Sequence, residues 1–155
     1  MFRFVFDTDV IVAAMRSPSG ASAALLGEVL DRRLKMLASV PLFFEYEAKC
    51  TDPVHWTAAG MSREQADIFI NGIAALVLPV KTHYLWRPKL RDPNDEMVLE
   101  VAVNGRADAI VTFNLRDYGA VPKSYNIEVI KPSSAIRRVR NEWNINLSIE
   151  ATQIA

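Results

Sequence analysis

The sequence predicts an α/β protein with a three-layer α/β/α architecture, in which a mostly parallel sheet is flanked by helices. Short runs of Phe, Val and Ile, suited to strands buried on both faces, alternate with segments whose apolar residues recur at helical spacing. Strands that alternate with helices in this way typically form one parallel sheet with both faces covered. The chain has 155 residues, half of them apolar, which is enough for one domain with its own core.

In the first half of the chain, turn and capping residues separate the predicted elements. Pro41 stands where a first-turn proline would and opens a helix. Ser62 is a favourable N-cap for the helix that follows, with Glu64 and Gln65 in the first turn. Residues 52–60 contain Pro and Gly and are expected to form a loop or broken turn. The predicted strands span 4–6, 34–40 and 76–80, and the predicted helices span 23–33, 42–50 and 62–76.

The second half contains the clearest helix of the chain, at residues 91–105. It begins with Asp92 and Pro93, has apolar side chains at helical spacing, and ends in Asn104 and Gly105. The remaining predicted elements are buried strands over 107–113 and 125–130 and a basic helix that starts at 131.

These elements predict one compact unit and no second domain. Residues 1–140 are expected to form it, and residues 141–155 a tail that packs on it or faces a partner. The sequence shows no internal repeat, low-complexity tract or linker. His55 and His83 have no metal-ligand spacing between them, which argues against a structural zinc site. Nucleotide-binding glycine loops and the serine-hydrolase motif are also absent from the sequence.

The composition is typical of a protein from a reducing cytoplasm. The 18 Lys and Arg residues are balanced by 18 Asp and Glu, which argues against general coating of nucleic acid but permits a local basic patch. The single Cys50 cannot form an internal disulfide and is expected in the core rather than as a nucleophile. No leader precedes the first strand, and the apolar stretches are shorter than a membrane span, so we expect a soluble cytoplasmic protein.

Acidic and amide side chains gather where ligands bind in such a sheet, beyond the carboxyl ends of its strands. Two of these groups follow predicted strands directly, a third opens the helix at 91–105, and a fourth lies in the helix after the second strand. The side chains are Asp7 and Asp9, Asn114 and Asp117, Asp92 with Asp95 and Glu96, and Glu45.

Converging carboxylates repel one another, and one of them becomes protonated unless a cation neutralises the group. Hard oxygen ligands favour Mg²⁺ or Mn²⁺, which retain several waters and bridge to phosphate. The chemistry that suits such a centre is metal-assisted hydrolysis of a phosphodiester, because a bound ion lowers the pKa of water and stabilises the attacking and leaving oxygens.

Most of these acids also have an ordinary structural explanation. Asp92 before a proline is a good N-cap, and capping the next helix is our preferred role for Asp9. Glu96 suits a solvated first turn, where the helix dipole favours a negative charge. Glu45 could be an exposed helix acid and Asp117 a turn residue. Asp7 directly ends a buried strand and is poorly explained as a cap, so the metal hypothesis rests on the joint placement of these residues.

Three segments of the chain together resemble the successive signatures of PIN-domain proteins. The segments read "FVFDTDVIVAAM", "SVPLFFEYEAKC" and "RDPNDEMVLEVAVNGRADAIVTFNLRDY". The resemblance runs over about residues 2–132 and is strongest to the bacterial branch that contains VapC-type toxins of type II toxin–antitoxin pairs. It implies a parallel sheet with an acidic pocket at the strand ends, and a Mg²⁺- or Mn²⁺-dependent ribonuclease.

Carried over by position, the resemblance implies a set of site residues. Asp7 and Asp95 would ligate the main ion, with Asp92 as a companion. Glu45 would be a further ligand and would orient or deprotonate the attacking water. The family has an acid where this chain has Asn114, and usually has Asn where this chain has Asp9. Asn114 and Asp117 would complete the shell around a second ion or the water, and the exchange at 114 puts a second metal in question.

The resemblance also implies partners, namely an RNA substrate, a cognate antitoxin and a second copy of the chain in a homodimer. The apolar residues of 43–50 and 66–76 could supply a dimer surface. A basic stretch before the metal helix could contact RNA through Lys81, Arg87, Lys89 and Arg91, with Tyr84 and Trp86 stacking on bases. The alternative is a solvated loop with both aromatic rings in the core, which is our preference for Trp86. A second basic patch, at 136–140, could equally face a protein. The alternatives are a non-catalytic PIN-like module that binds RNA or protein, and a nuclease or phosphatase that uses the same acids on DNA or another phosphate ester.

Overall fold

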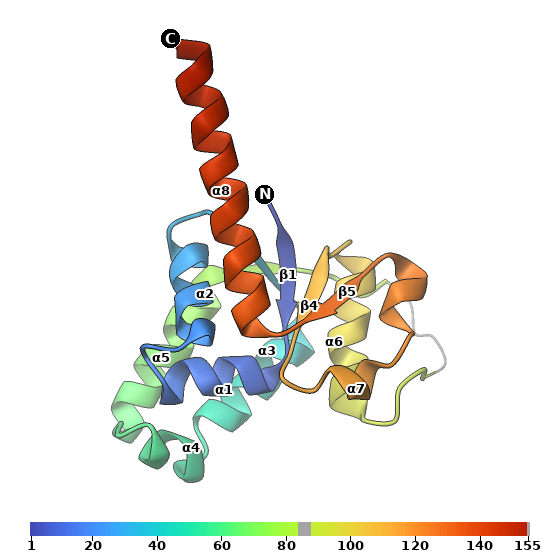
Figure 1. Ribbon diagram of the computed structural model, residues 1–155. Coiled ribbons are helices and arrows are strands. Elements are labelled where there is room, and N and C mark those ends of the chain that lie inside the picture. The colour runs from blue at the N-terminus through green and yellow to red at the C-terminus, as the bar shows by residue number, and fades with distance from the viewer. Residues whose placement is uncertain (84–87, 155) are drawn as a thin grey trace.

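A computed structural model of the protein describes residues 1–83 and 88–154, and its centre is a five-stranded sheet (Figure 1). All four strand pairings are parallel, and the strand order is β3-β2-β1-β4-β5. The predicted α/β fold is therefore confirmed, with a wholly parallel sheet in place of a mostly parallel one. The strands are β1 (Arg3–Phe6), β2 (Lys35–Ala38), β3 (Val77–Pro79), β4 (Ala109–Val111) and β5 (Glu128–Ile130).

Helices connect the strands and surround the sheet. They are α1 (Thr8–Arg16), α2 (Ala21–Leu30), α3 (Val40–Cys50), α4 (Pro53–Ala58), α5 (Arg63–Leu76), α6 (Pro93–Asn104), α7 (Leu115–Tyr118), the 3-10 turn η1 (Pro122–Tyr125) and α8 (Pro132–Ile154). α2 packs on α1 and α8, while α3 packs on α5 and α6, and α6 contacts three of the strands. α1 packs on α3 as well as on α2, and so connects these two groups of helices.

The central strands form the core, as their unbroken apolar sequence predicts. Phe4, Val5 and Phe6 are fully buried, as are the three residues of β4. Burial of side chains from both strand faces is the pattern of a parallel sheet covered by helices. Cys50 is also fully buried, and burial raises the pKa of its thiol to about 12, so the prediction of a core cysteine is confirmed.

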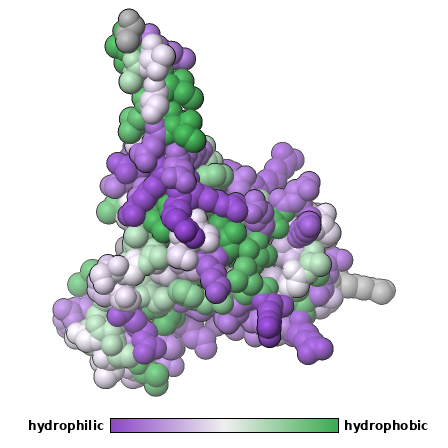
Figure 2. Space-filling view, viewed as in Figure 1, coloured by the Kyte–Doolittle hydropathy of each residue, from purple (hydrophilic) through white to green (hydrophobic). Residues whose placement is uncertain are grey.

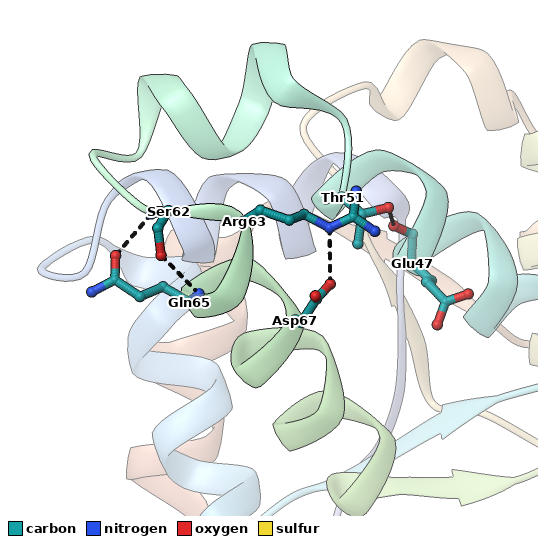
Figure 3. A network of polar contacts seen from close by, with 6 residues as sticks. All are labelled: Glu47, Thr51, Ser62, Arg63, Gln65 and Asp67. Carbon is teal, nitrogen blue, oxygen red and sulfur yellow. Dashed lines mark hydrogen bonds and ion pairs between the residues drawn. The ribbon is translucent and has the colours of Figure 1, made fainter.

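Two segments predicted as loop or turn contain short helices. Residues 53–58 form α4, because Asp52 caps its first turn by accepting the N–H of Val54 at 2.9 Å. The residues around Asp117 form α7. The predicted cap at Ser62 is confirmed as part of a capping box, in which the Ser62 hydroxyl accepts the N–H of Gln65 and the Gln65 side chain accepts the N–H of Ser62 (Figure 3).

The last helix extends well beyond the body of the protein (Figure 1). The sequence left residues 141–155 as an uncertain tail, whereas the structure continues α8 through Ile154. The buried residues of this helix end at Val139, and hydrophobic side chains lie on the surface of its projecting part (Figure 2). The exposed ones are Ile145, Leu147, Ile149 and Ile154.

Over the described part of the chain, no single helix has the length and apolar character needed to cross a membrane. α1 and α2 meet that condition only as a pair, and the two are bent by 98° where they meet.

Candidate functional site

A single pocket of about 600 Å³ is lined by every residue that the sequence proposed for the site. It lies where β1 and β4 end, since Asp7 follows the last residue of β1 and Asn114 comes shortly after β4. The proposed residues that line it are Asp7, Glu45, Asp92, Asp95, Asn114 and Asp117. The strand-end argument therefore placed these side chains together, although their roles stay predictions.

Asp7 is the most constrained of these carboxylates. Its Oδ1 accepts the N–H of Thr8 at 2.7 Å, and its Oδ2 accepts the hydroxyls of Thr112 at 2.8 Å and Tyr118 at 3.0 Å. Asp7 is also the N-cap of α1, so the interpretation that it is poorly explained as a cap was wrong. The reason is that β1 ends at Phe6 and α1 starts at Thr8, so Asp7 is the only residue between them and falls at the cap position.

Asp9 does not cap the helix, and the preference for that role was wrong. It lies in the first turn of α1, where its Oδ2 accepts the backbone N–H of Phe113 and the side-chain amide of Asn114, both at 3.1 Å. Its Oδ1 is buried and has no hydrogen-bond partner in the described residues. Asp9 therefore ties the start of α1 to the segment after β4 and keeps one carboxylate oxygen unused.

The opposite wall of the pocket is formed by α3 and the start of α6. Glu45 is half-buried in α3, and its Oε1 accepts the side-chain amide of Asn94 at 3.4 Å. Asp92 caps α6 by accepting the N–H of Asn94 at 2.8 Å, so its predicted capping role is confirmed. Asp92 also lines the pocket, and capping does not exclude a second role.

Two acids in the first turn of α6 are buried. Asp95 is 8% exposed and lines the pocket. Glu96 is also 8% exposed, and its Oε2 accepts the N–H groups of Lys89 at 3.0 Å and Leu90 at 2.8 Å. The expectation that Glu96 is a solvated acid was wrong, because the preceding loop folds back over it and uses it to hold two backbone donors.

Burial and mutual repulsion raise the pKa values of three acids in the pocket. Burial, and then the charge of Asp7, raises the pKa of Asp9 to about 6. Burial raises the pKa of Asp95 to about 6, with further repulsion from Asp7, Asp92 and Asp117. Burial also raises the pKa of Asp7, although its hydrogen bonds to Thr112, Tyr118 and Thr8 oppose this rise. The pocket thus disfavours the accumulation of negative charge, which is the condition that a bound cation relieves.

The chemistry of the side chains fits a hard divalent cation. All of the candidate metal ligands are carboxylate or amide oxygens, and Oδ1 of Asp9 is buried and accepts no hydrogen bond from the described residues. Within residues 1–83 and 88–154, no three His, Cys, Asp or Glu side chains lie close enough to share one ion. Binding would therefore use one or two carboxylates at a time with water completing the shell, as is usual for Mg²⁺.

Several residues of the site were missed from sequence. Thr112 and Tyr118 hold Asp7, and the only sequence signal was a polar residue at the end of a buried strand and a tyrosine four residues beyond Asn114. Asn94 and the cationic side chains that line the pocket had no signal, because they reach it only through helix packing. The cationic side chains are Arg16 and Lys49, and the imidazole of His55 lines the pocket with them.

The predicted basic rim is only partly described. Lys89 and Arg91 are exposed and line a second pocket of about 420 Å³, whereas Lys81 is exposed and lines neither pocket. Tyr84, Trp86 and Arg87 lie outside the described residues. In the other basic patch, Arg138 forms an ion pair with Glu128 at 2.6 Å, and Arg140 forms one with Glu28 at 3.4 Å. Two arginines of this patch are therefore paired with acids of the same chain.

Comparisons with known proteins agree with this fold. A family model described as PIN domain matches residues 3–116. The fold is similar to a chain in the crystal structure of VapBC2 from Rickettsia felis bound to a DNA fragment from their promoter, with a TM-score of 0.58 at 14% identity. That match covers 83% of this chain and 98% of the other. No curated protein matches the sequence.

Proposed function

Because the chain belongs to the PIN-domain family, we propose that it is a metal-dependent endoribonuclease that hydrolyses RNA phosphodiester bonds. The observation that carries the proposal is the single pocket at the strand ends, where carboxylates from four segments meet and the pKa values of Asp7, Asp9 and Asp95 are raised. An open pocket of about 600 Å³ is large enough to admit a nucleotide unit with its phosphate.

Asp7 and Asp95 would hold Mg²⁺ or Mn²⁺, with Glu45 and Asp92 as further ligands, directly or through water. When bound, the ion would supply a positive charge that acidifies water and stabilises the oxygens of the reacting phosphate. The hydroxyls of Thr112 and Tyr118 donate to Oδ2 of Asp7 and so fix the direction of its carboxylate. Such supporting hydrogen bonds are part of most metal sites in proteins.

Glu45 would accept the proton of the attacking water. It is half-buried on the wall formed by α3, and its contact to Asn94 is long at 3.4 Å, which leaves the carboxylate free to turn. Water adds to the phosphorus atom, its proton passes to Glu45, and the departing oxygen of the neighbouring nucleotide takes up a proton from solvent. Asp117 and Asn114, which also line the pocket, would complete the shell around a second ion or the attacking water.

Asp9 would supply the charge that Asn114 lacks. The two side chains are in contact through the 3.1 Å hydrogen bond from the Asn114 amide to Oδ2 of Asp9, and both line the pocket. The resemblance implies an acid at 114 and an asparagine at 9, so the carboxylate and the amide have exchanged places across one hydrogen bond. The total charge of the pocket is therefore the same as in the implied pattern.

The proposal includes a biological setting, in which the chain is the toxin of a toxin–antitoxin pair and works in the cytoplasm as a homodimer. It is supported by the fold, which is similar to that of a chain in a VapBC complex. Among the segments suggested for a dimer surface, Phe44 and Ile68 are 58% and 70% exposed. Expression of the chain alone should arrest growth, and co-expression of the product of the adjacent small gene should relieve it.

The central test is cleavage of RNA by the purified protein in Mn²⁺. We expect wild type to cleave single-stranded RNA and Asp7→Asn to be inactive, with both proteins equally folded by circular dichroism. Asp67→Asn, on the exposed face of α5, is the matched control and should keep wild-type activity. Full activity in Asp7→Asn would refute the proposed site, and cleavage of a matched DNA oligonucleotide at the same rate would refute the RNA specificity.

The second candidate is a non-catalytic PIN-like module that binds RNA or a protein. Two observations favour it, namely the neutral Asn114 at one site position and the lack of a ready three-ligand cluster in the described residues. Calorimetric titration with Mn²⁺ separates the two functions. Binding that is lost in Asp95→Asn supports the enzyme, whereas no heat of binding by wild type supports the module.

A further inference from the structure

We propose that a single RNA strand crosses the acidic pocket between two positively charged flanks, each of which binds a phosphate beside the one that is cut. This inference rests on the proposed function and assigns the path of its substrate. The first flank consists of Arg16, Lys49 and His55, and the second flank consists of Lys89, Arg91 and Arg116.

The first flank forms one wall of the acidic pocket itself. Arg16 is the last residue of α1, Lys49 is the penultimate residue of α3, and His55 lies in α4; α1 packs on both of these helices. In the part of the chain that the structure describes, neither Arg16 nor Lys49 forms an ion pair with an acid. The Nδ1 atom of His55 is buried there without a hydrogen-bond partner. Arg16 and Lys49 thus line the pocket with their positive charges available, and the ring of His55 lies beside them.

The second flank lines a neighbouring pocket of about 420 Å³. That pocket shares Asp92, Asp95 and Asp117 with the acidic pocket and none of the first flank, so the acids lie between the two flanks. Over residues 1–83 and 88–154, Lys89, Arg91 and Arg116 also have no acidic partner within ion-pair distance.

Glu96 gives the second flank a fixed position. Its buried carboxylate accepts the N–H groups of both Lys89 and Leu90, which ties the loop to the first turn of α6. Charge-assisted hydrogen bonds of this kind are stronger than neutral ones. These two hydrogen bonds hold the loop that carries Lys89 and Arg91 beside the acids. Glu96 is therefore a positioning residue rather than a ligand.

A phosphodiester chain is the ligand that this alternation of charge fits. The cations on the flanks would neutralise the phosphates on either side, while a divalent ion on the acids would neutralise the central one. Phe113, which is 47% exposed, lines the acidic pocket and offers a ring on which one base can stack. Because a base must leave its duplex partner to reach that ring, the path suits a single strand.

The test is binding of a fluorescein-labelled single-stranded RNA of about 12 nucleotides, a length within the usual range for one binding domain. Fluorescence anisotropy is measured in Ca²⁺ over a range of salt concentrations, and a gel checks that the RNA stays intact. Each lost phosphate contact on a single strand lowers the slope of log affinity against log salt by about 0.7. We expect this loss for Lys49→Ala on the first flank and, independently, for Arg116→Ala on the second.

Two further variants make the test specific. Lys35→Ala removes an exposed lysine at the start of β2. This residue lies at the amino ends of the strands, away from the pocket at their carboxyl ends, so the variant should keep the wild-type slope. Phe113→Leu keeps an apolar side chain without a ring and should weaken binding roughly tenfold at every salt concentration, with an unchanged slope.

The outcomes separate this inference from the proposed function. Unchanged slopes in both flank variants, or in either one, would overturn the two-flank path, as would the absence of RNA binding by wild type at low salt. Wild type that binds with the expected slopes but does not cleave RNA in Mn²⁺ would refute the ribonuclease and leave the path standing.

Discussion

The hydroxyl of Tyr118 donates a 3.0 Å hydrogen bond to Oδ2 of Asp7, a residue 111 positions earlier in the chain. Tyr118 is fully buried at the end of α7, and Asp7 is buried at the end of β1. The same hydroxyl also lowers the pKa of Asp95 against the larger effect of burial. One phenol thus supports both carboxylates proposed to hold the main ion, and it couples the β4–α7 segment to the site.

Tyr118→Phe should lower the Mn²⁺ affinity of the proposed site without leaving a cavity in the core. The ring keeps its packing, but Asp7 loses the donor of its 3.0 Å hydrogen bond, and the hydroxyl that lowers the pKa values of Asp7 and Asp95 is gone. Loss of a supporting hydrogen bond typically costs about 10- to 100-fold in metal affinity. Mn²⁺ titration by calorimetry should show a drop of this size, and the rise of cleavage rate with pH should move to higher pH.

Tyr46→Phe is the matched control for that variant. Tyr46 is also fully buried, but its hydroxyl donates to the backbone carbonyl of Phe6 and not to a carboxylate. The variant should lose about 1 kcal/mol of stability, as expected for one buried hydrogen bond, with Mn²⁺ affinity unchanged. Equal losses of Mn²⁺ affinity in both variants would show that Tyr118→Phe acts by destabilising the core in general and not through Asp7.

Reciprocal exchange at positions 9 and 114 should reveal that these two side chains share one charge. Asp9→Asn removes the carboxylate and should lower Mn²⁺ affinity about tenfold or more. Asn114→Asp in that background places a carboxylate on the other side of the same 3.1 Å contact and should restore most of the affinity. The measurement is a double-mutant cycle by calorimetry, with a coupling of about 0.5–3 kcal/mol for side chains in contact.

Asn114→Asp alone tests the effect of an added carboxylate, where Asp9→Asn tests the effect of a lost one. Without metal it sets two carboxylates against each other at hydrogen-bond distance, so the melting temperature in EDTA should fall. Mn²⁺ should restore it. Additive effects of the two single substitutions would contradict a shared role for Asp9 and Asn114.

Without metal, the protein should be most stable in mild acid. The pKa of Asp9 and the pKa of Asp95 rise from 3.8 to about 6 on folding, so the folded state binds protons more tightly than the unfolded state. Stability from this source is complete below pH 4 and is lost as the pH rises through about 6. Melting temperatures in EDTA should fall across this interval, and added Mn²⁺ should raise them more at pH 7.5 than at pH 5.

Neutral substitutions test whether those two acids cause the pH dependence. Asp9→Asn and Asp95→Asn should each flatten the curve in EDTA and raise the melting temperature near neutral pH. Asp67→Asn, on the exposed surface of α5, should leave it unchanged. A curve that keeps its full slope in both pocket variants would place the effect elsewhere in the chain.

The fold was predictable because its signals are local. The runs at β1 and β4 are apolar on both faces, and the caps at Ser62 and Asp92 mark helix starts. The convergence of acids followed from one rule, that parallel strands end at the same edge. The errors concern side-chain partners, which depend on where a helix starts to within one residue and on which loop folds back.

Asp7 and Asp9 show the limit of sequence reasoning most clearly. A helix that starts two residues later would have made Asp9 the cap and freed Asp7, as the sequence suggested. The actual start at Thr8 reverses the roles and turns Asp9 toward Asn114, 105 positions away. No periodicity in the sequence distinguishes these two starts. The burial of Glu96 was unpredictable for the same reason, since it depends on a loop that bends back to it.

The projecting end of α8 should be dispensable for the fold. Just before it, the Arg33 guanidinium lies over the Trp143 ring at 5.1 Å and the N-terminal amine pairs with Glu142 at 3.0 Å. Deletion of residues 144–155 removes no side chain that is buried among the described residues 144–154, and it should shift the melting temperature by no more than about 2 °C, as for other surface changes. Deletion from residue 135 onward removes the buried Ile136 and Val139 as well, and should lower it strongly. A large drop with the shorter deletion that grows with protein concentration would instead show that Ile145, Leu147 and Ile149 pack against a second copy, because association stabilises a fold by mass action.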